Sequence, residues 1–199
     1  MSDFTFIDLL SIKGMTEARL AHLIKKFKEP DVIFNLSYNE LVYEQEIEHE
    51  LAERLVDYRR DNRTRDAISK CQDLGVKVVT FLDDEYPDGL KNITQAPPVL
   101  FIRGTYQECD ACAIALIGTR RATTYGRTVT DKFAREFCAA GVTVISGLAR
   151  GIDTQAHMSA LAEGGRTIAV MGTGIDRIYP PENQRLAERI VKSGALFTD

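Results

Sequence analysis

Three glycine-bearing segments, each directly after an apolar run, contain the residues of this sequence best suited to binding an anion. They are Gly118-Thr119-Arg120, Ser146 to Asp153, and Gly172-Thr173-Gly174. Loops of this kind expose backbone N–H groups to negative charge, and an arginine guanidinium can hold a phosphate through two parallel hydrogen bonds. A threonine hydroxyl adds one further donor. The chemistry indicated is therefore phosphate binding.

The apolar runs before these segments are predicted to be parallel β-strands. The strands are expected at residues 113–117, 142–145, 167–171 and 195–197. Helical stretches are expected between them, near residues 126–140, 152–163 and 183–193. This alternation predicts an α/β fold with a Rossmann-like, doubly wound, mainly parallel sheet covered on both faces. Since the carboxyl ends of parallel strands share one edge, the three glycine segments are expected to form one phosphate-binding rim there.

The first part of the chain, residues 1–75, is predicted to be a small all-helical accessory domain of the helix-hairpin-helix or SAM-like kind. Apolar residues recur there at helical spacing, as at Leu20, Leu23 and Ile24. Gly14 separates two helical patterns, and Thr16 is placed to cap the second helix. Two interpretations of this turn stay open, contact with DNA phosphates through its backbone amides and a plain packing module. The Rossmann-like domain is expected to cover residues 76–199.

The amino-acid composition of the chain limits the kinds of function that it can have. The chain has 199 residues, 44% of them hydrophobic, and a net charge of -4, so any nucleic-acid site must be local. No apolar run approaches the roughly 18 residues that span a bilayer. Residues 1–10 contain Asp3 and Asp8 instead of the basic start and apolar stretch of a targeting segment, so we expect a cytoplasmic protein without membrane contact. The cysteines, four in number, are expected to be reduced. Cys109 and Cys112 form a lone CxxC, which is too few ligands for a zinc site, and we predict no metal and no cofactor.

Two standard nucleotide-binding fingerprints are absent. The segment after the first strand contains neither G-x-G-x-x-G nor G-x-x-x-x-G-K-[ST]. A phosphate held by Gly118, Thr119 and Arg120 therefore fits a sugar-phosphate backbone better than a dinucleotide. Asp153 and His157 could form an acid–histidine pair, but the sequence offers them no nucleophile, and we expect no enzymatic activity. Asp153 is expected to hold free amides of its own helix, with His157 as a structural partner.

Several motifs follow one another in the order and spacing of a known family. They are Ala115-Leu116-Ile117-Gly118-Thr119-Arg120, Thr124-Tyr125-Gly126, Ile145 to Asp153, Ala156-His157, Arg166 to Val170 and Tyr179-Pro180-Pro181-Glu182-Asn183. Over residues 80–199 the sequence resembles the DprA (Smf) family of DNA-processing proteins. The resemblance implies a domain that binds single-stranded DNA, helps load the RecA recombinase in natural transformation or recombination, and forms a homodimer.

The resemblance also implies roles for individual residues. Arg120 matches the arginine of the family's Gly-Ser-Arg turn, with Thr119 in the serine position, and Arg166 matches a basic position before the third strand. Both arginines are expected to contact phosphates from the same carboxyl edge of the sheet. The predicted DNA-binding residues are Gly118, Thr119, Arg120, Gly147, Gly151, Arg166 and Gly172.

A nucleotide sensor or nucleotide hydrolase is the alternative function, and the C-terminal end of the sequence departs from the family pattern. The same fold serves nucleotide sensors and nucleotide hydrolases. The hydrolases resemble one another through a Pro-Gly-Gly-x-Gly-Thr loop, where this chain has Met171-Gly172-Thr173-Gly174. The family pattern normally continues beyond Asp199, so the second domain is expected to be a C-terminally truncated fragment or an unusually short member.

Overall fold

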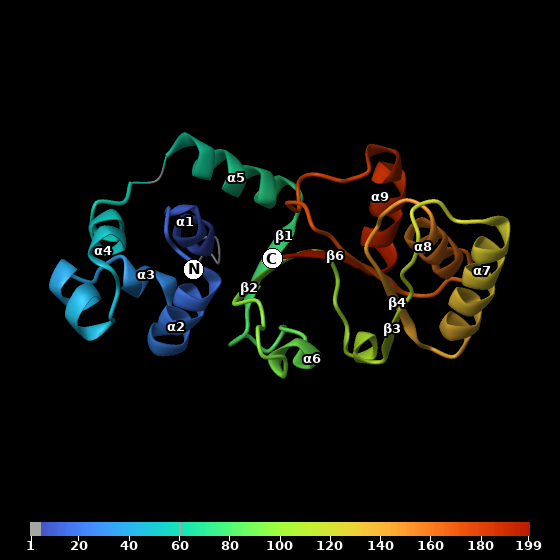
Figure 1. Ribbon diagram of the computed structural model, residues 1–199, viewed down its shortest axis with the longest axis horizontal. Helices are drawn as coiled ribbons and strands as arrows, with labels where there is room; N and C mark the ends of the chain where they lie inside the picture. The colour runs from blue at the N-terminus through green and yellow to red at the C-terminus, as the bar shows by residue number, and fades with distance from the viewer. Residues whose placement is uncertain (1–4, 60) are drawn as a thin grey trace. The chain divides into compact units, whose positions relative to one another are not determined.

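The computed structural model describes residues 5–59 and 61–199 (Figure 1). The chain divides into two compact units. The first unit comprises Met1–Asp73, Val78–Tyr86 and Leu90–Leu100. The second unit comprises Leu74–Lys77, Pro87–Gly89 and Phe101–Asp199. The domain boundary that the sequence predicts between residues 75 and 76 stays a prediction.

Short helices make up most of the first unit. They are α1 (Thr5–Ser11), α2 (Glu17–Phe27), α3 (Pro30–Ile33), the π-helical turn η1 (Glu40–Glu44), α4 (His49–Val56) and α5 (Asn62–Asp73). A further short helix, α6 (Asp88–Lys91), lies on the segment that leads to strand β2. Leu20, Leu23 and Ile24 are buried, as the helical spacing predicts, because they share one side of α2.

The turn between α1 and α2 has the capping geometry expected from the sequence. Thr16 is the N-cap of α2, and its side chain accepts a hydrogen bond from the Arg19 backbone N–H at 3.3 Å. Gly14 has a φ of 98°, which an L side chain rarely adopts. Arg19 donates to the Gly14 carbonyl and Arg54 donates to the Lys13 carbonyl, each at 2.7 Å. These contacts fix the turn inside the first unit, and DNA contact at its amides stays a hypothesis.

A mostly parallel sheet organises the chain from residue 76 onward. Its strands are β1 (Val76–Thr80), β2 (Val99–Gly104), β3 (Ala113–Ala115), β4 (Thr143–Ser146), β5 (Thr167–Val170) and β6 (Ala195–Thr198), in the order β1-β2-β6-β5-β4-β3. Strands β3 to β6 pair in parallel, and β2 pairs antiparallel with β6. The Rossmann-like α/β class predicted from the sequence is confirmed.

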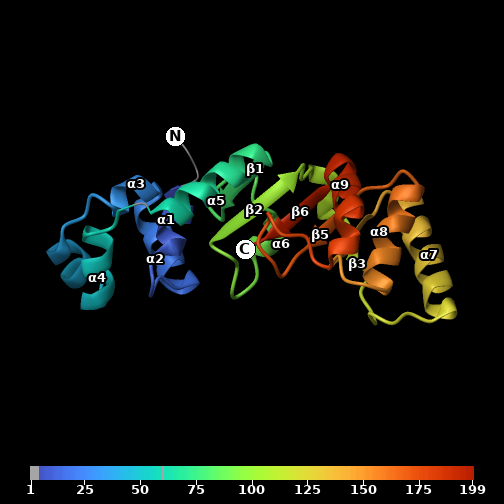
Figure 2. The same cartoon turned by 90° about the horizontal axis from the view of Figure 1, so that it is seen from above.

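Three helices connect the parallel strands. They are α7 (Thr124–Ala139), α8 (Ile152–Ala162) and α9 (Gln184–Ser193), and short 3-10 turns occur at η2 (Glu108–Ala111) and η3 (Pro181–Asn183). Helix α8 packs against both α7 and α9, so the three form one layer (Figures 1 and 2). Every connection steps the same way along the sheet, and right-handed crossovers then place the helices on one face. From the sequence, helices were expected on both faces of the sheet, whereas these three lie on one.

The core under this layer is built from small side chains. Ala134 of α7, Ala156 and Ala160 of α8, and Val144 of β4 are fully buried against one another. Because these side chains are short, the helices lie close to the sheet, and the loops at the strand ends are held firmly. Within residues 5–59 and 61–199, none of the helices has the length and apolar character needed to cross a membrane.

Candidate nucleic-acid interface

The loops after three parallel strands meet around one pocket, which we call the rim pocket. Its volume is about 200 Å³. It is lined by Arg120, Gly147, Ala149, Arg150, Met171, Gly172, Thr173, Tyr179 and Pro180. These residues come from the segments that follow β3, β4 and β5, and from the approach to η3. The structure thus brings together parts of all three glycine segments at the carboxyl edge of the sheet, as strand parallelism predicts.

Gly118, Thr119 and Gly151 do not line the rim pocket, although Arg120 and Arg150 beside them do. Gly151 has a φ of 81°, and a Cβ there would stand 2.2 Å from the Thr119 carbonyl oxygen. The Ile152 backbone N–H donates to the same oxygen at 3.2 Å. A Cβ on Gly118 would meet the Ile152 side chain at 2.7 Å. These residues therefore lock the first loop to the start of α8 and set the position of Arg120.

Gly172 differs from these packing glycines. An added Cβ at this position would meet no atom within 4 Å, and its φ is not in the left-handed region. Neither packing nor backbone conformation requires glycine there. Because Gly172 lines the rim pocket, the missing side chain leaves open space for a ligand.

Asp153 organises the loop between β4 and α8. Its buried carboxylate accepts hydrogen bonds from the backbone N–H groups of Gly147, at 3.1 Å, and Ala149, at 3.4 Å. Asp153 was expected to bind amides of its own helix, but its hydrogen bonds are instead with the preceding loop. Two amides beside the rim pocket are thereby already occupied. An anion in the pocket would depend more on side chains than on these amides.

His157 is sealed inside the second unit. Its Nδ1 lies 2.7 Å from the Thr167 hydroxyl, which itself donates to the Val144 carbonyl at 2.7 Å, so Nδ1 carries the proton. Burial lowers the pKa of His157 to about 3. The partner of His157 is Thr167, not the expected Asp153. A fully buried, neutral imidazole has no access to a substrate, so the general-base alternative gains no support.

Two arginines of the rim pocket have different surroundings. The Arg120 side chain is exposed and makes no hydrogen bond or ion pair with any residue in the described part of the chain. Arg150 forms a forked pair with Glu182, at 2.5 and 3.2 Å. Hydrogen bonding to this guanidinium lowers the pKa of Glu182. Arg120 is therefore the guanidinium available to an incoming phosphate, with the half-exposed Tyr179 ring beside the same pocket.

Arg166 lies at the other edge of the sheet. It immediately precedes β5 and makes a bidentate pair with Asp110, with Nε 2.8 Å and Nη2 2.7 Å from the two carboxylate oxygens. Nη2 also donates to the Thr105 carbonyl at 2.7 Å. Burial opposes ionisation of Asp110, but hydrogen bonds from Arg166 and Thr143 outweigh it and lower the pKa of the carboxyl. The expectation that Arg166 shares an edge with Arg120 is wrong, because a residue before a parallel strand lies at its amino end.

Several residues that line the rim pocket were not predicted from the sequence. Ala149, Met171, Thr173 and Pro180 were not among the predicted contacts. The available signal for Met171 and Thr173 was their position one and three residues beyond the end of β5. Arg150 and Tyr179 also line the rim pocket and were likewise not among the predicted contacts. Among residues 5–59 and 61–199, no group of three or more His, Cys, Asp or Glu is arranged to hold a metal ion.

Much of this chain is similar in sequence to a known protein family. Residues 77–199 match the family model described as DNA recombination-mediator protein A. The chain belongs to this family. It is 35% identical over 155 residues to the protein Smf of Synechocystis, covering 76% of this chain and 39% of that protein. It is 36% identical over 126 residues to the DNA processing protein DprA of Bacillus subtilis, covering 63% of this chain and 42% of that protein. The chain thus spans about two fifths of the length of these relatives.

Two solved structures of the family share the architecture. The X-ray structure of DprA from Streptococcus pneumoniae matches with a TM-score of 0.80 and 27% identity, covering 100% of this chain and 67% of that one. DprA from Helicobacter pylori matches with a TM-score of 0.54 and 28% identity, covering 62% of this chain and 54% of that one. The latter structure is described as giving insight into a unique single-stranded DNA binding mode. The DprA-like fold of this chain is therefore established.

Proposed function

We propose that this chain binds single-stranded DNA at the rim pocket, as part of a recombination mediator. The observation that carries the proposal is the Arg120 guanidinium, which has no partner among the described residues and lies where the loops after β3, β4 and β5 meet. The single-stranded DNA binding described for the Helicobacter pylori relative supports it. The proposed phosphate contact is made by Arg120, and Gly147 and Gly172 line the open space beside it. Gly118, Thr119 and Gly151 hold Arg120 in place.

The size of the rim pocket favours a strand passing over it. A pocket of about 200 Å³ is smaller than the roughly 300–1,000 Å³ of pockets that enclose a whole small molecule. An extended strand can place one phosphate against Arg120 and one base against Tyr179, because stacking tolerates any base. The rest of the strand would follow the surface.

The alternative, a nucleotide sensor or nucleotide hydrolase, is supported less well. Met171-Gly172-Thr173-Gly174 lacks the Pro-Gly-Gly-x-Gly-Thr pattern of the hydrolases. The buried His157 could not reach a substrate in the rim pocket. We therefore propose a binding role without catalysis and without a cofactor.

Three further parts of the proposal concern the whole protein, of which this chain matches about two fifths. We propose that it assists RecA loading, forms a homodimer and acts in the cytoplasm. Binding by two copies would allow one strand to be held at more than one rim pocket, which raises affinity without new contacts. Sedimentation of the chain at about the micromolar concentrations typical of weak association would test the dimer.

Fluorescence anisotropy with a labelled oligo-dT tests the central proposal. The expected result is tighter binding of oligo-dT than of a blunt duplex, since the rim pocket has no helix aimed into a groove. A mononucleotide should compete weakly, because it offers one contact where a strand offers several. Equal or tighter binding of the duplex would contradict the proposal, and strong competition by the mononucleotide would favour the sensor alternative.

A further inference from the structure

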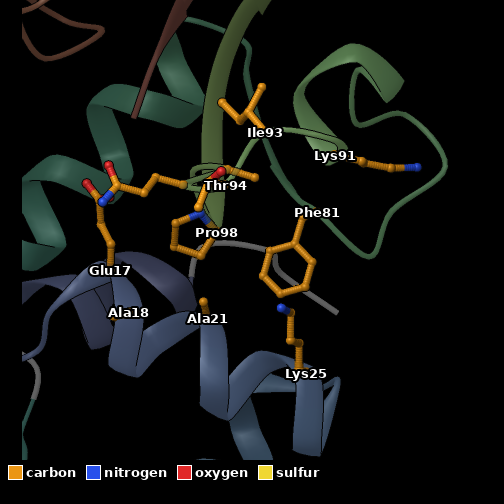
Figure 3. A pocket seen from close by; sticks show the side chains of 11 residues that line it. Glu17, Ala18, Ala21, Lys25, Phe81, Lys91, Ile93, Thr94 and Pro98 are labelled. Atoms are coloured by element: carbon orange, nitrogen blue, oxygen red, sulfur yellow. The ribbon is translucent and has the colours of Figure 1, made fainter.

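The first unit has a separate pocket, which we call the lysine pocket (Figure 3). Its volume is about 450 Å³. It is lined by Glu17, Ala18, Ala21, Lys25, Phe81, Lys91, Ile93, Thr94, Gln95, Ala96 and Pro98. All of these residues belong to the first unit, so the pocket is complete within it. This volume lies within the range of pockets that enclose a small molecule.

One wall of the lysine pocket is a single side of helix α2. Glu17, Ala21 and Lys25 are four residues apart in turn, so they line up along the helix. The alanine side chains leave the middle of this wall open. Glu17 and Lys25 are separated by about 12 Å along the axis, which gives the pocket an acidic end and a basic end.

The basic end combines cations with an aromatic ring. The Lys25 ammonium lies 5.4 Å from the centre of the Phe81 ring, a cation–π distance. Lys91 lines the same pocket and is exposed. In Figure 3, Lys25 and Phe81 lie on the opposite side of the pocket from Glu17, with Pro98 and Thr94 between them, and the Lys91 side chain points away from Lys25. An aromatic ring beside basic side chains is the combination that holds single-stranded nucleic acid without a groove.

We propose that the lysine pocket binds one nucleotide of single-stranded nucleic acid, as a second contact besides the rim pocket. The phosphate lies near Lys25, and the base packs against Phe81 and Pro98. Glu17, which can only accept hydrogen bonds when ionised, receives the amino group of the base. The choice of ligand rests on the proposed function, because the rim pocket identifies the polymer that the protein handles.

Charge placement favours a nucleotide over an acidic peptide. A nucleotide has its negative charge at the phosphate and hydrogen-bond donors at the base edge, which matches the two ends of the lysine pocket. An acidic peptide would bring carboxylates along the whole wall and toward Glu17, where like charges repel. The same reasoning predicts that cytosine, which has an amino group, is preferred to thymine, which has none.

Nuclear magnetic resonance titration of the full chain with oligo-dC can follow both pockets at once. We expect shifts at the amides of Ala21, Lys25, Phe81 and Thr94 as well as at the rim-pocket loops. Shifts confined to the rim-pocket loops overturn the second site and leave the proposed function intact. Shifts confined to the lysine pocket overturn the rim assignment and support the second site. A poly-glutamate peptide that shifts the lysine pocket when oligo-dC does not would overturn the nucleotide assignment.

Matched variants on α2 provide an independent measurement. Lys25→Gln should weaken oligo-dC binding about two- to fivefold, the range for an exposed charge pair. Phe81→Leu should weaken it about fivefold or more through lost stacking. Lys26→Gln is the control, since Lys26 is exposed on the same helix and does not line the pocket. Equal effects of Lys25→Gln and Lys26→Gln would overturn the site, and equal binding of oligo-dC and oligo-dT would overturn the role of Glu17.

Discussion

Arg120 is held at the rim pocket by its backbone, while its guanidinium has no partner in the described part of the chain. Arg120→Ala should therefore weaken oligo-dT binding by about tenfold to a hundredfold, from a charge-assisted contact of about 1.5–3 kcal/mol. Arg120→Lys should recover part of the loss, because an ammonium keeps the charge but not the planar fork. Anisotropy titration measures both. Arg63→Ala, at a side chain 97% exposed in the first unit, is the charge-matched control, and equal affinities of Arg120→Ala and this control would refute the contact.

Arg166 makes a different prediction, because its pairing with Asp110 is structural. Arg166→Ala leaves the fully buried Asp110 carboxylate without its main partner, and loss of one partner of a buried pair costs about 3–5 kcal/mol. The free energy of unfolding, measured by urea denaturation, should fall by roughly this amount. Arg185→Ala, at an exposed position on α9, should leave it nearly unchanged. If Arg166→Ala keeps its stability and loses DNA affinity, the phosphate contact predicted from the sequence is the better account.

Substitution by alanine should have different effects at two glycines of the strand-end loops, Gly172 and Gly151. Gly172→Ala places a methyl group in open space, so the fold should survive while oligo-dT binding weakens. Gly151→Ala forces a Cβ into the Thr119 carbonyl at a φ of 81°, which should destabilise the protein by more than about 1 kcal/mol. Thermal unfolding and anisotropy together separate the two effects. Unchanged DNA affinity of a folded Gly172→Ala variant would remove Gly172 from the site.

His157 of α8, buried against Thr167 of β5, should make the free energy of unfolding depend on pH. His157 has its pKa lowered to about 3 by burial, from 6.5, so the unfolded chain takes up a proton more readily than the folded one. Its contribution to stability is complete above pH 6.5 and is lost as pH falls toward 3. At about pH 5 the loss should be about 2 kcal/mol. Urea denaturation of His157→Asn, which keeps a donor toward Thr167, should show a flatter pH dependence, and identical curves for the two proteins would count against this account.

The sequence could predict the elements of the second unit because their signals are local. The apolar runs and helical spacing between residues 113 and 198 place every strand and helix within a few residues of β3–β6 and α7–α9. Strand parallelism then predicts that Arg120, Gly147 and Gly172 share one edge, and the rim pocket brings them together.

Hydrogen bonds and ion pairs between residues far apart in the sequence could not be predicted, because no local sequence pattern indicates them. Arg166 and Asp110 are 56 residues apart, and nothing in the sequence near either one indicates that they pair. Asp153 accepts from loop amides at Gly147 and Ala149 because the loop folds back over the start of α8. The lysine pocket depends on α2 meeting residues near Phe81 and Pro98, a tertiary contact that no periodicity encodes.

On the scale of the whole molecule, a net charge of -4 means that DNA affinity must come from local phosphate contacts acting against an overall repulsion. Log affinity for oligo-dT should therefore fall linearly with log salt, by about 0.7 for each phosphate neutralised. Removing Arg120 should reduce this slope by about 0.7, and base preference should stay unchanged because a phosphate contact has no sequence information. Anisotropy titrations at several salt concentrations measure the slope for both proteins. An Arg120→Ala variant with the parent's slope would mean that Arg120 does not contact a phosphate, whatever its effect on affinity at a single salt concentration.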